Sequence, residues 1–331
     1  SHNSKETVSM GPARLFWQIF SHPPLPTTTF AGKTVIVTGA NVGLGKEAVK
    51  HFVRLGATVI GTARSKSKAA TALADINAET KGPGRATVWE LEYGSYASVL
   101  GFCERALSEL DRLDVVILNA GAATRTYELL EGKESSITIN VISTLLLALS
   151  LLPKLRQTAA TYNVNPCLTV TSSKIHSWAK FPEREAADIF AALNDPLSPM
   201  MQERYPTSKL LQLLAIRELA SRTSSTSPQV VINLVSPGLN RTSLTRETTG
   251  LEAIVLSAIH YIFAWDPEVG SRILVHATMA GKKSHGVLLD KCEIENDILA
   301  PWIETDEGRI IQRKVWSELE KKLEAIRPGI L

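Results

Sequence analysis

The sequence predicts an α/β fold, in which a single doubly wound domain holds a seven-stranded parallel sheet flanked by helices. Short β-branched segments alternate with segments whose apolar residues recur at helical spacing. A glycine-rich turn follows the first of these strands, and polar residues directly follow several others. The length of 331 residues favours one such domain with an N-terminal and a C-terminal extension.

The first strand and the first helix enclose a glycine-rich turn. Residues 34–38 are β-branched, and apolar residues recur at helical spacing up to Leu55. Gly39, Gly43 and Gly45 lie between them in the spacing G-x-x-x-G-x-G, which differs from the dinucleotide fingerprint G-x-G-x-x-G. A strand, a glycine turn and a helix start together aim backbone N–H groups at a pyrophosphate. Nucleotide binding is therefore predicted, with a plain structural turn as the alternative.

The second strand, predicted over 58–62, ends beside a cation. Arg64 follows it with no carboxylate nearby, and Lys46 adds a second cation at the same corner. In dinucleotide folds an acidic residue here holds the ribose 2′-hydroxyl, whereas an arginine accommodates a 2′-phosphate. NADP(H) is therefore predicted over NAD(H). The alternative is that Arg64 simply begins a solvated helix over 65–80.

The remaining elements continue the alternation of strands and helices. Strands are predicted over 86–91, 114–118, 167–171, 230–235 and 286–289, and helices over about 95–110, 136–155 and 205–222. Residues 1–30 form the predicted N-terminal extension, 31–290 the domain and 291–331 a C-terminal helical extension. The extension is predicted to pack back on the domain through an apolar stripe: Ile310, Ile311, Val315, Leu319, Leu323 and Ile326.

Polar motifs follow the strands in a fixed order. These are Asn119-Ala120-Gly121, Ser172-Ser173 and Pro237-Gly238, while Tyr205 and Lys209 are spaced i, i+4 on a helix. With the T-G-x-x-x-G-x-G turn and Asn140, this order resembles the classical short-chain dehydrogenase/reductase family over about residues 30–290. The resemblance is closest to the retinol-dehydrogenase-like branch and looser to reductases of fungal secondary metabolism. It implies a Rossmann fold.

The resemblance implies four catalytic residues. Tyr205 would be the proton donor or acceptor at the substrate oxygen, its pKa lowered from about 10 by the Lys209 ammonium and the positive nicotinamide. Lys209 would also bond the nicotinamide ribose. Ser173 would hold the carbonyl oxygen, with Ser172 as the alternative. Asn140 would bend its helix and keep a water that connects Lys209 to solvent.

The resemblance also implies a set of cofactor-binding residues at the strand ends. They are Gly39, Asn41, Gly43, Leu44, Gly45, Lys46, Arg64, Glu92, Asn119, Ala120, Gly121, Tyr205, Lys209, Pro237, Gly238 and Thr242. Glu92 stands where the family usually has an aspartate that contacts the adenine. No metal-ligand spacing is present.

Two long segments bear on the substrate. Residues 174–204 separate Ser173 from Tyr205, and residues 239–265 stand where the family carries its substrate lid. The lid segment is apolar, and His176 and Trp178 are placed to line a pocket, so a bulky hydrophobic substrate is predicted. The alternative for 174–204 is a surface excursion without ligand contact.

The predicted function is NADP(H)-dependent interconversion of a carbonyl and an alcohol on a hydrophobic small molecule, as in a ketoreductase. The alternative is a protein of the same fold that binds NADP(H) without redox chemistry, as a cyclase-type enzyme or a cofactor-sensing regulator. A membrane-bound lipid oxidoreductase is a third hypothesis, based on an apolar cluster within residues 11–30. The plain interpretation of that cluster is an N-terminal helix packed on the domain.

Composition limits the partners and the compartment. A net charge of +3 without a dense Lys/Arg run disfavours nucleic acid. Three widely spaced cysteines favour a reducing compartment, so a cytoplasmic location is predicted. No apolar run is expected to reach the roughly 18–20 residues that cross a bilayer. In the family the helices at 136–155 and 205–222 often build a dimer interface, and their leucine content permits a homodimer here.

Overall fold

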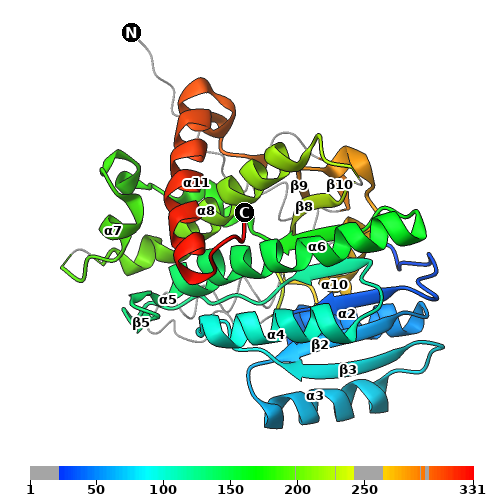
Figure 1. Ribbon diagram of the computed structural model, residues 1–331. Helices are drawn as coiled ribbons and strands as arrows, with labels where there is room; N and C mark the ends of the chain where they lie inside the picture. Colours follow the sequence, from blue (N-terminus) through cyan, green and yellow to red (C-terminus); the bar gives the residue numbers. More distant parts are fainter. Residues whose placement is uncertain (1–21, 198, 228, 242–263, 291, 295–297) are drawn as a thin grey trace.

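The computed structural model describes residues 22–197, 199–227, 229–241, 264–290, 292–294 and 298–331. A sheet of eight strands runs through its centre in the order β10-β9-β8-β7-β4-β1-β2-β3 (Figure 1). The strands are β1 Thr34–Val37, β2 Thr58–Ala63, β3 Arg85–Glu90, β4 Val115–Leu118, β7 Cys167–Thr171, β8 Val231–Ser236, β9 Leu288–Asp290 and β10 Glu293–Ile294. Seven are parallel, as predicted, and β10 adds a short antiparallel edge.

Helices cover both faces of the sheet (Figure 1). On one face lie α2 Gly43–Arg54, α3 Lys66–Glu79 and α10 Pro267–Ala277, and on the other α4 Tyr96–Glu109, α6 Thr144–Tyr162 and α8 Met201–Thr223. Each face has its own cluster of buried apolar side chains, because β1, β4 and β7 are buried along their whole length apart from Thr34. The doubly wound architecture is therefore confirmed.

The order of the strands reverses at β1. This strand pairs with β2 on one side and with β4 on the other, so the chain winds outward in both directions from it. In such sheets ligands bind outside the carboxyl ends of the strands at the reversal. The segments after β1 and β4 therefore mark the position of the functional site.

The helix predicted over 136–155 is longer than expected. It runs from α5 Ser135–Ile137 through a π-helical segment, Thr138–Ser143, into α6, and Pro153 lies inside it. The whole helix, Ser135–Tyr162, is long and apolar enough to cross a membrane by length and composition, contrary to the expectation from the apolar runs. Within the part of the chain that the structure describes, 94% of its apolar window is buried inside the protein, as for a core helix.

The segment between Ser173 and Tyr205 is packed into the domain. It forms two short 3₁₀ turns, Lys174–Trp178 and Pro182–Glu185, and the helix α7 Ile189–Leu193. Phe181 and Phe190 are buried, and Glu318 of α11 (Asp306–Ile326) accepts hydrogen bonds from the Ile189 and Phe190 N–H groups at 2.8 and 3.3 Å. The segment is therefore hydrogen-bonded to the C-terminal helix and partly buried, and it is not a surface excursion.

The C-terminal helix α11 packs on α8, as the sequence predicts (Figure 1). Ile311, Val315, Leu319 and Leu323 are buried, but Ile310 is 59% exposed, so its assignment to the stripe is wrong. Adjacent residues differ by about 100° around a helix, and only one of two neighbouring isoleucines faces the core. The leucines of α6 are already buried within one chain. The predicted lid residues 242–263 and the apolar cluster near the N-terminus lie outside the described residues.

Candidate functional site

The glycine turn after β1 is shaped by close backbone contacts. Gly39 has φ +68°, and a Cβ on Gly45 would lie 2.3 Å from the Gly39 oxygen and 2.7 Å from Nδ2 of Asn119. A side chain at Gly45 would therefore fill the cradle at the start of α2. No side chain caps that helix start, so its first N–H groups have no side-chain partner to compete with an anion. The turn thus fits the diphosphate of a dinucleotide.

Thr38, the residue before the turn, holds the ends of three strands together. Its Oγ1 accepts hydrogen bonds from the N–H groups of Asn119 (2.9 Å) and Ala120 (3.1 Å) and from the hydroxyl of Tyr93 (2.8 Å). The side-chain amide of Asn119 donates to the Thr38 carbonyl at 3.0 Å. Asn119 therefore supports the junction of β1 and β4. Thr38 and Tyr93 are absent from the predicted site, although the threonine of the T-G motif was a visible signal.

The corner beyond β2 and β3 carries an ion pair. Arg64 Nε lies 3.4 Å from Glu92 Oε2, and the Arg64 side chain is 72% exposed. The other oxygen of Glu92 accepts a hydrogen bond from the Gly94 N–H at 2.9 Å. The structure thus brings together the two residues predicted for the adenosine end of the cofactor.

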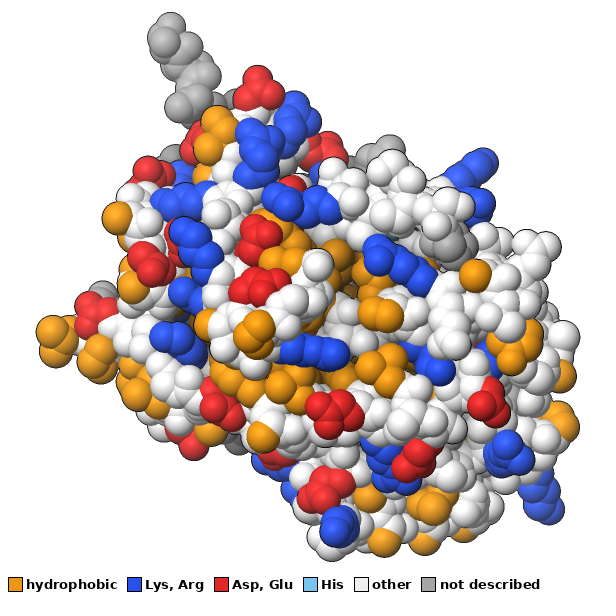
Figure 2. All heavy atoms as spheres, viewed as in Figure 1, with side chains coloured by type: hydrophobic (Ala, Val, Ile, Leu, Met, Phe, Trp, Pro, Cys, Tyr) orange, Lys and Arg blue, Asp and Glu red, His pale blue; other side chains and the backbone are white. Residues whose placement is uncertain are grey.

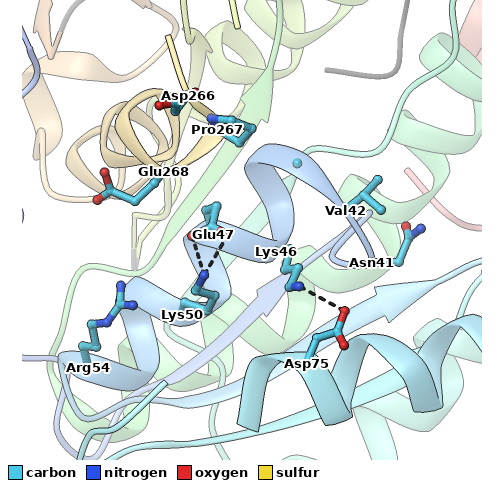
Figure 3. A pocket seen from close by; sticks show the side chains of 11 residues that line it. Asn41, Val42, Lys46, Glu47, Lys50, Arg54, Asp75, Asp266, Pro267 and Glu268 are labelled. Atoms are coloured by element: carbon cyan, nitrogen blue, oxygen red, sulfur yellow. Dashed lines mark hydrogen bonds and ion pairs between the residues drawn. The ribbon is translucent and has the colours of Figure 1, made fainter. Parts of the chain in front are cut away.

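Lys46 does not point to that corner. Its ammonium lies 3.1 Å from the carboxylates of Asp75 and Glu79 on α3, and the pair with Asp75 is drawn in Figure 3. The positive charge of Lys46 is therefore already paired with two carboxylates. The predicted second cation for a 2′-phosphate is bound to the neighbouring helix instead.

A hollow of about 540 Å³ opens beside this ion pair, between α2, α3 and the start of α10 (Figure 3). Its charged groups are largely matched by one another, since Lys50 bonds Glu47 and Glu79 at 2.8 Å each. Glu268, also in its wall, lies 3.2 Å from His51. The hollow reaches the glycine turn at Asn41 and Gly43, but Tyr205 and Lys209 are not in its wall.

The predicted catalytic residues meet where α8 passes the ends of β4 and β7. Lys209 Nζ donates to the Thr171 carbonyl (2.9 Å) and to Gln212 Oε1 (3.2 Å) and lies 5.9 Å from the centre of the Tyr205 ring. A Cβ on Gly121 would be 3.1 Å from Asn140 Oδ1 and 3.7 Å from Lys209 Nζ. Gly121, Asn140 and Lys209 thus converge on one point.

Asn140 lies in the π-helical segment, where the resemblance implied a bent helix. Its Oδ1 accepts from the Ala122 N–H (2.9 Å), and its Nδ2 donates to the Ala122 carbonyl (2.7 Å) and to Ser208 Oγ (2.9 Å). Ser208 in turn donates to the carbonyl of Tyr205 at 2.8 Å. Asn140 therefore ties the chain after β4 to the helical turn that carries Tyr205.

The two candidate serines differ in exposure. Ser172 is buried, and its N–H donates to the Val235 carbonyl at 2.8 Å, which continues the pairing of β7 with β8. Ser173 is half-buried and accepts from the Ile175 N–H at 3.3 Å. A ring nitrogen of His176 lies 2.8 Å from the Ser173 carbonyl. Ser173 is therefore the more exposed of the two serines, and His176 contacts its main-chain carbonyl.

Burial dominates the ionisation of Tyr205 and Lys209. It raises the pKa of Tyr205 to about 12 and lowers the pKa of Lys209 to about 8. The predicted lowering of the Tyr205 pKa depends on the positive nicotinamide as well as on Lys209, so it stays a prediction for the protein with cofactor bound. Within the protein alone, Tyr205 is therefore a neutral phenol at physiological pH.

The segment after β8 is fixed by a side chain that sequence reasoning missed. Asn240 Nδ2 donates to the carbonyls of Pro237 (2.9 Å) and Gly238 (3.1 Å). A Cβ on Gly270 would lie 1.8 Å from Asn240 Oδ1, so α10 starts directly against this amide. Pro237 and Gly238 are thus held at the carboxyl edge of the sheet. Thr242 lies outside the described residues.

The comparisons with known proteins agree with this geometry. Residues 33–172 match the model of the short chain dehydrogenases. A short-chain dehydrogenase/reductase of Cryptosporiopsis sp. (strain 8999), dmxR8, is 43% identical over 322 residues, which cover 96% of this chain and 98% of that protein. This relative fits the predicted likeness to fungal reductases.

Two solved structures share the fold. A short chain dehydrogenase from Burkholderia cenocepacia J2315 in complex with NADP has a TM-score of 0.59 at 18% identity, covering 80% of this chain and 97% of its own. The 3-ketoacyl-(acyl-carrier-protein) reductase from Brucella melitensis, complexed with NADH, has a TM-score of 0.58 at 19% identity, covering 79% and 97%. The same fold thus holds either nicotinamide cofactor.

Proposed function

The chain belongs to the short-chain dehydrogenase/reductase family, and from this premise we propose that it is an NADP(H)-dependent oxidoreductase that interconverts a carbonyl and an alcohol on a hydrophobic small molecule. The observation that carries the proposal is the convergence of Lys209 and Asn140 beside Gly121, with the Tyr205 ring centre 5.9 Å from the Lys209 ammonium. Ser173 lies at the end of the neighbouring strand β7.

The residues at the carboxyl edge of the sheet fit a nicotinamide dinucleotide. The glycine cradle and the uncapped start of α2 would hold the diphosphate. Lys209 has one N–H left after its bonds to Thr171 and Gln212, and this N–H is available to the nicotinamide ribose. When bound, the nicotinamide supplies or accepts the hydride.

The protein supplies the proton and orients the carbonyl. A neutral Tyr205 phenol donates its proton to the substrate oxygen during reduction. The Ser173 hydroxyl donates a hydrogen bond to the same oxygen and stabilises the charge that develops there. The Lys209 ammonium favours the phenolate that Tyr205 leaves behind. In the oxidative direction the same Tyr205 oxygen would accept the proton from the alcohol.

NADP(H) is the proposed cofactor because of Arg64. Its guanidinium is mostly exposed, and its one described acidic partner is the half-exposed Glu92. Exposed ion pairs contribute about 0–1 kcal/mol, so a 2′-phosphate displaces this carboxylate at little cost. Guanidinium groups bind phosphate oxygens through two parallel hydrogen bonds, which an unmodified ribose does not offer.

The surroundings of Ser173 favour a bulky apolar substrate. Trp178 and Met200 belong to the packed segment between Ser173 and Tyr205, and they are 53% and 39% exposed. Large exposed apolar side chains beside a catalytic site contribute to substrate binding. On the face shown in Figure 2, Lys and Arg side chains alternate with Asp and Glu and form no continuous basic area, which suits an uncharged ligand better than nucleic acid.

NADPH consumption with a panel of hydrophobic ketones and quinones tests this function. Turnover by the native protein and its loss in Tyr205→Phe would support the proposal. Binding of NADPH without turnover of any carbonyl would favour the alternative of a cyclase-type enzyme or a cofactor-sensing regulator. All four predicted catalytic residues are present, which favours the enzyme.

A cytoplasmic location and a possible homodimer complete the proposal. The face of α8 on which α11 packs is covered within one chain, so a dimer would use other surfaces. Arg327, just beyond α11, also donates to Ser150 of α6 at 3.0 Å. Light scattering distinguishes a monomer from a homodimer, and sedimentation with liposomes, with and without residues 1–30, tests the membrane alternative.

A further inference from the structure

Gln212 connects two of the predicted catalytic residues. It lies on α8 three residues beyond Lys209, and it is 1% exposed. Lys209 Nζ donates to its Oε1 at 3.2 Å, and its Nε2 donates to the main-chain carbonyl of Asn140 at 2.8 Å. The oxygen and the nitrogen of the Gln212 amide are therefore both hydrogen-bonded. In the sequence it is a polar residue within a run of leucines, which is the signal that could have found it.

The carbonyl of Asn140 is available because of the π-helical segment Thr138–Ser143. A π turn widens the helix and disturbs the regular i→i−4 bonding of main-chain carbonyls. Two neighbouring main-chain carbonyls in this segment accept hydrogen bonds from side chains. Thr144 Oγ1 donates to the Ile139 oxygen at 3.1 Å, and Gln212 Nε2 donates to the Asn140 oxygen. The π-helical segment therefore exposes a main-chain carbonyl, and Gln212 donates a hydrogen bond to it.

Among the described residues, the bonds of the Asn140 side chain go to groups other than Lys209. Its amide is bonded to both main-chain groups of Ala122 and to Ser208. The connection from Asn140 to the ammonium thus runs from the main-chain carbonyl through Gln212. An amide takes up and releases no proton at neutral pH, so this connection holds the ammonium in place without relaying protons.

Lys209 depends on its two acceptors. It is 4% exposed, and burial disfavours its charged form. The Thr171 carbonyl and Gln212 Oε1 both present the negative end of a dipole to the ammonium. Tyr205 is the titratable group beside it among the described residues. Removing one acceptor therefore shifts the ionisation of Lys209 directly.

We propose that Gln212 is a positioning residue that fixes the Lys209 ammonium relative to the main-chain carbonyl of Asn140. Its catalytic consequence rests on the proposed function. Its effect on the ionisation of Lys209 does not, so the two are tested separately.

An NMR titration of the Cε signal of Lys209, in protein labelled with ¹³C-lysine, measures that ionisation without turnover and needs no reagent to reach the buried amine. Gln212→Leu removes the acceptor and is expected to lower the midpoint by about one pH unit, a tenfold change in proton affinity. Gln212→Glu places a carboxylate there and is expected to raise it. The matched control is Gln157→Leu, because Gln157 accepts from Lys154 at 3.0 Å in the same i, i+3 arrangement on α6. This control leaves Lys209 unchanged.

Kinetics provide the second measurement. With a carbonyl substrate, kcat/KM of Gln212→Leu is expected to fall about 10- to 100-fold, the effect of one lost hydrogen bond to a charged group. The pH above which the rate declines should move down in Gln212→Leu and up in Gln212→Glu. Midpoints that stay unchanged, or move in the same direction in both variants, overturn the proposal.

A variant that does not fold and a native protein without activity are two further outcomes. If Gln212→Leu does not fold, Gln212→Asn, whose shorter amide cannot span both partners, replaces it with the same expected downward shift. If the native protein reduces no carbonyl, the proposed function fails, and the titration midpoints of Lys209 still decide the role of Gln212.

Discussion

Arg64 and Glu92 form an ion pair across the ends of β2 and β3, with Nε 3.4 Å from Oε2. The pair joins the residue predicted for the 2′-phosphate to the residue predicted for the adenine. Because both side chains are at least partly exposed, the pair itself is weak and exchangeable. We therefore propose that the preference between NADP(H) and NAD(H) depends on whether a 2′-phosphate takes the place of the Glu92 carboxylate at the Arg64 guanidinium.

Arg64→Asp is expected to weaken NADPH binding by about 10- to 100-fold, since a hydrogen bond to a charged group contributes about 1.5–3 kcal/mol. NADH, which lacks the phosphate, should be affected much less. Fluorescence titration with both cofactors measures the difference. Arg105→Asp, at an exposed arginine on α4, is the control and should alter neither affinity. Equal losses for NADPH and NADH in Arg64→Asp would refute the assignment of the phosphate site.

Thr38→Val tests the junction of the strands. The substitution preserves the shape of the side chain and leaves the N–H groups of Asn119 and Ala120 and the Tyr93 hydroxyl without their acceptor. Unpaired buried donors cost about 1–3 kcal/mol each, and partial relaxation should leave a loss of about 2–4 kcal/mol in the free energy of unfolding. Urea denaturation measures it. Thr71→Val, at an exposed threonine on α3, should change stability by less than about 0.5 kcal/mol.

A buried leucine and an exposed isoleucine of α11 test its packing. Leu319→Ala removes a fully buried side chain and is expected to cost about 2–5 kcal/mol. Ile310→Ala, at the exposed position, should be within about 0.5 kcal/mol of the native protein. Comparable losses at the two sites would show that α11 packs through a different face.

Much of the architecture is readable from the chain because it depends on local patterns. The β-branched segments place each parallel strand to within one or two residues, and the glycine turn and N-A-G motif locate the reversal at β1. The partner of a charged side chain, in contrast, can lie far away in the sequence. Lys46 bonds carboxylates 29 and 33 residues away, and nothing in its own segment distinguishes α3 from a phosphate as its partner.

The finer geometry of the site follows from packing that periodicity does not encode. A two-residue antiparallel strand such as β10 leaves no pattern, and the π-helical turn at Asn140 depends on contacts with α8. The burial of the Tyr205 phenol, which raises its pKa in the protein alone, also follows from packing. Sequence spacing shows the nearby ammonium but not the loss of water around the phenol.

The pH dependence of reduction reflects Lys209. Its pKa in the folded protein is about 8, below its ordinary value of 10.5, so the folded state loses this proton first. The rate of carbonyl reduction should be flat below that pH and decline above it, as the ammonium is lost. Between the two values the unfolded state binds the extra proton, so the Lys209 contribution to stability rises with pH. In Lys209→Met this rise in denaturation free energy should disappear. Its persistence in the variant would assign it to another group.

Transfer of deuterium from reduced cofactor to product tests the central claim most directly. The native protein is incubated with NADPH deuterated at the transferable C4 position and a hydrophobic ketone, and the alcohol is examined by mass spectrometry. We expect one deuterium on the carbinol carbon, with product formation lost in Tyr205→Phe although the cofactor still binds. An alcohol without the label, or undiminished reduction by Tyr205→Phe, would contradict the assignment of hydride and proton transfer to this site.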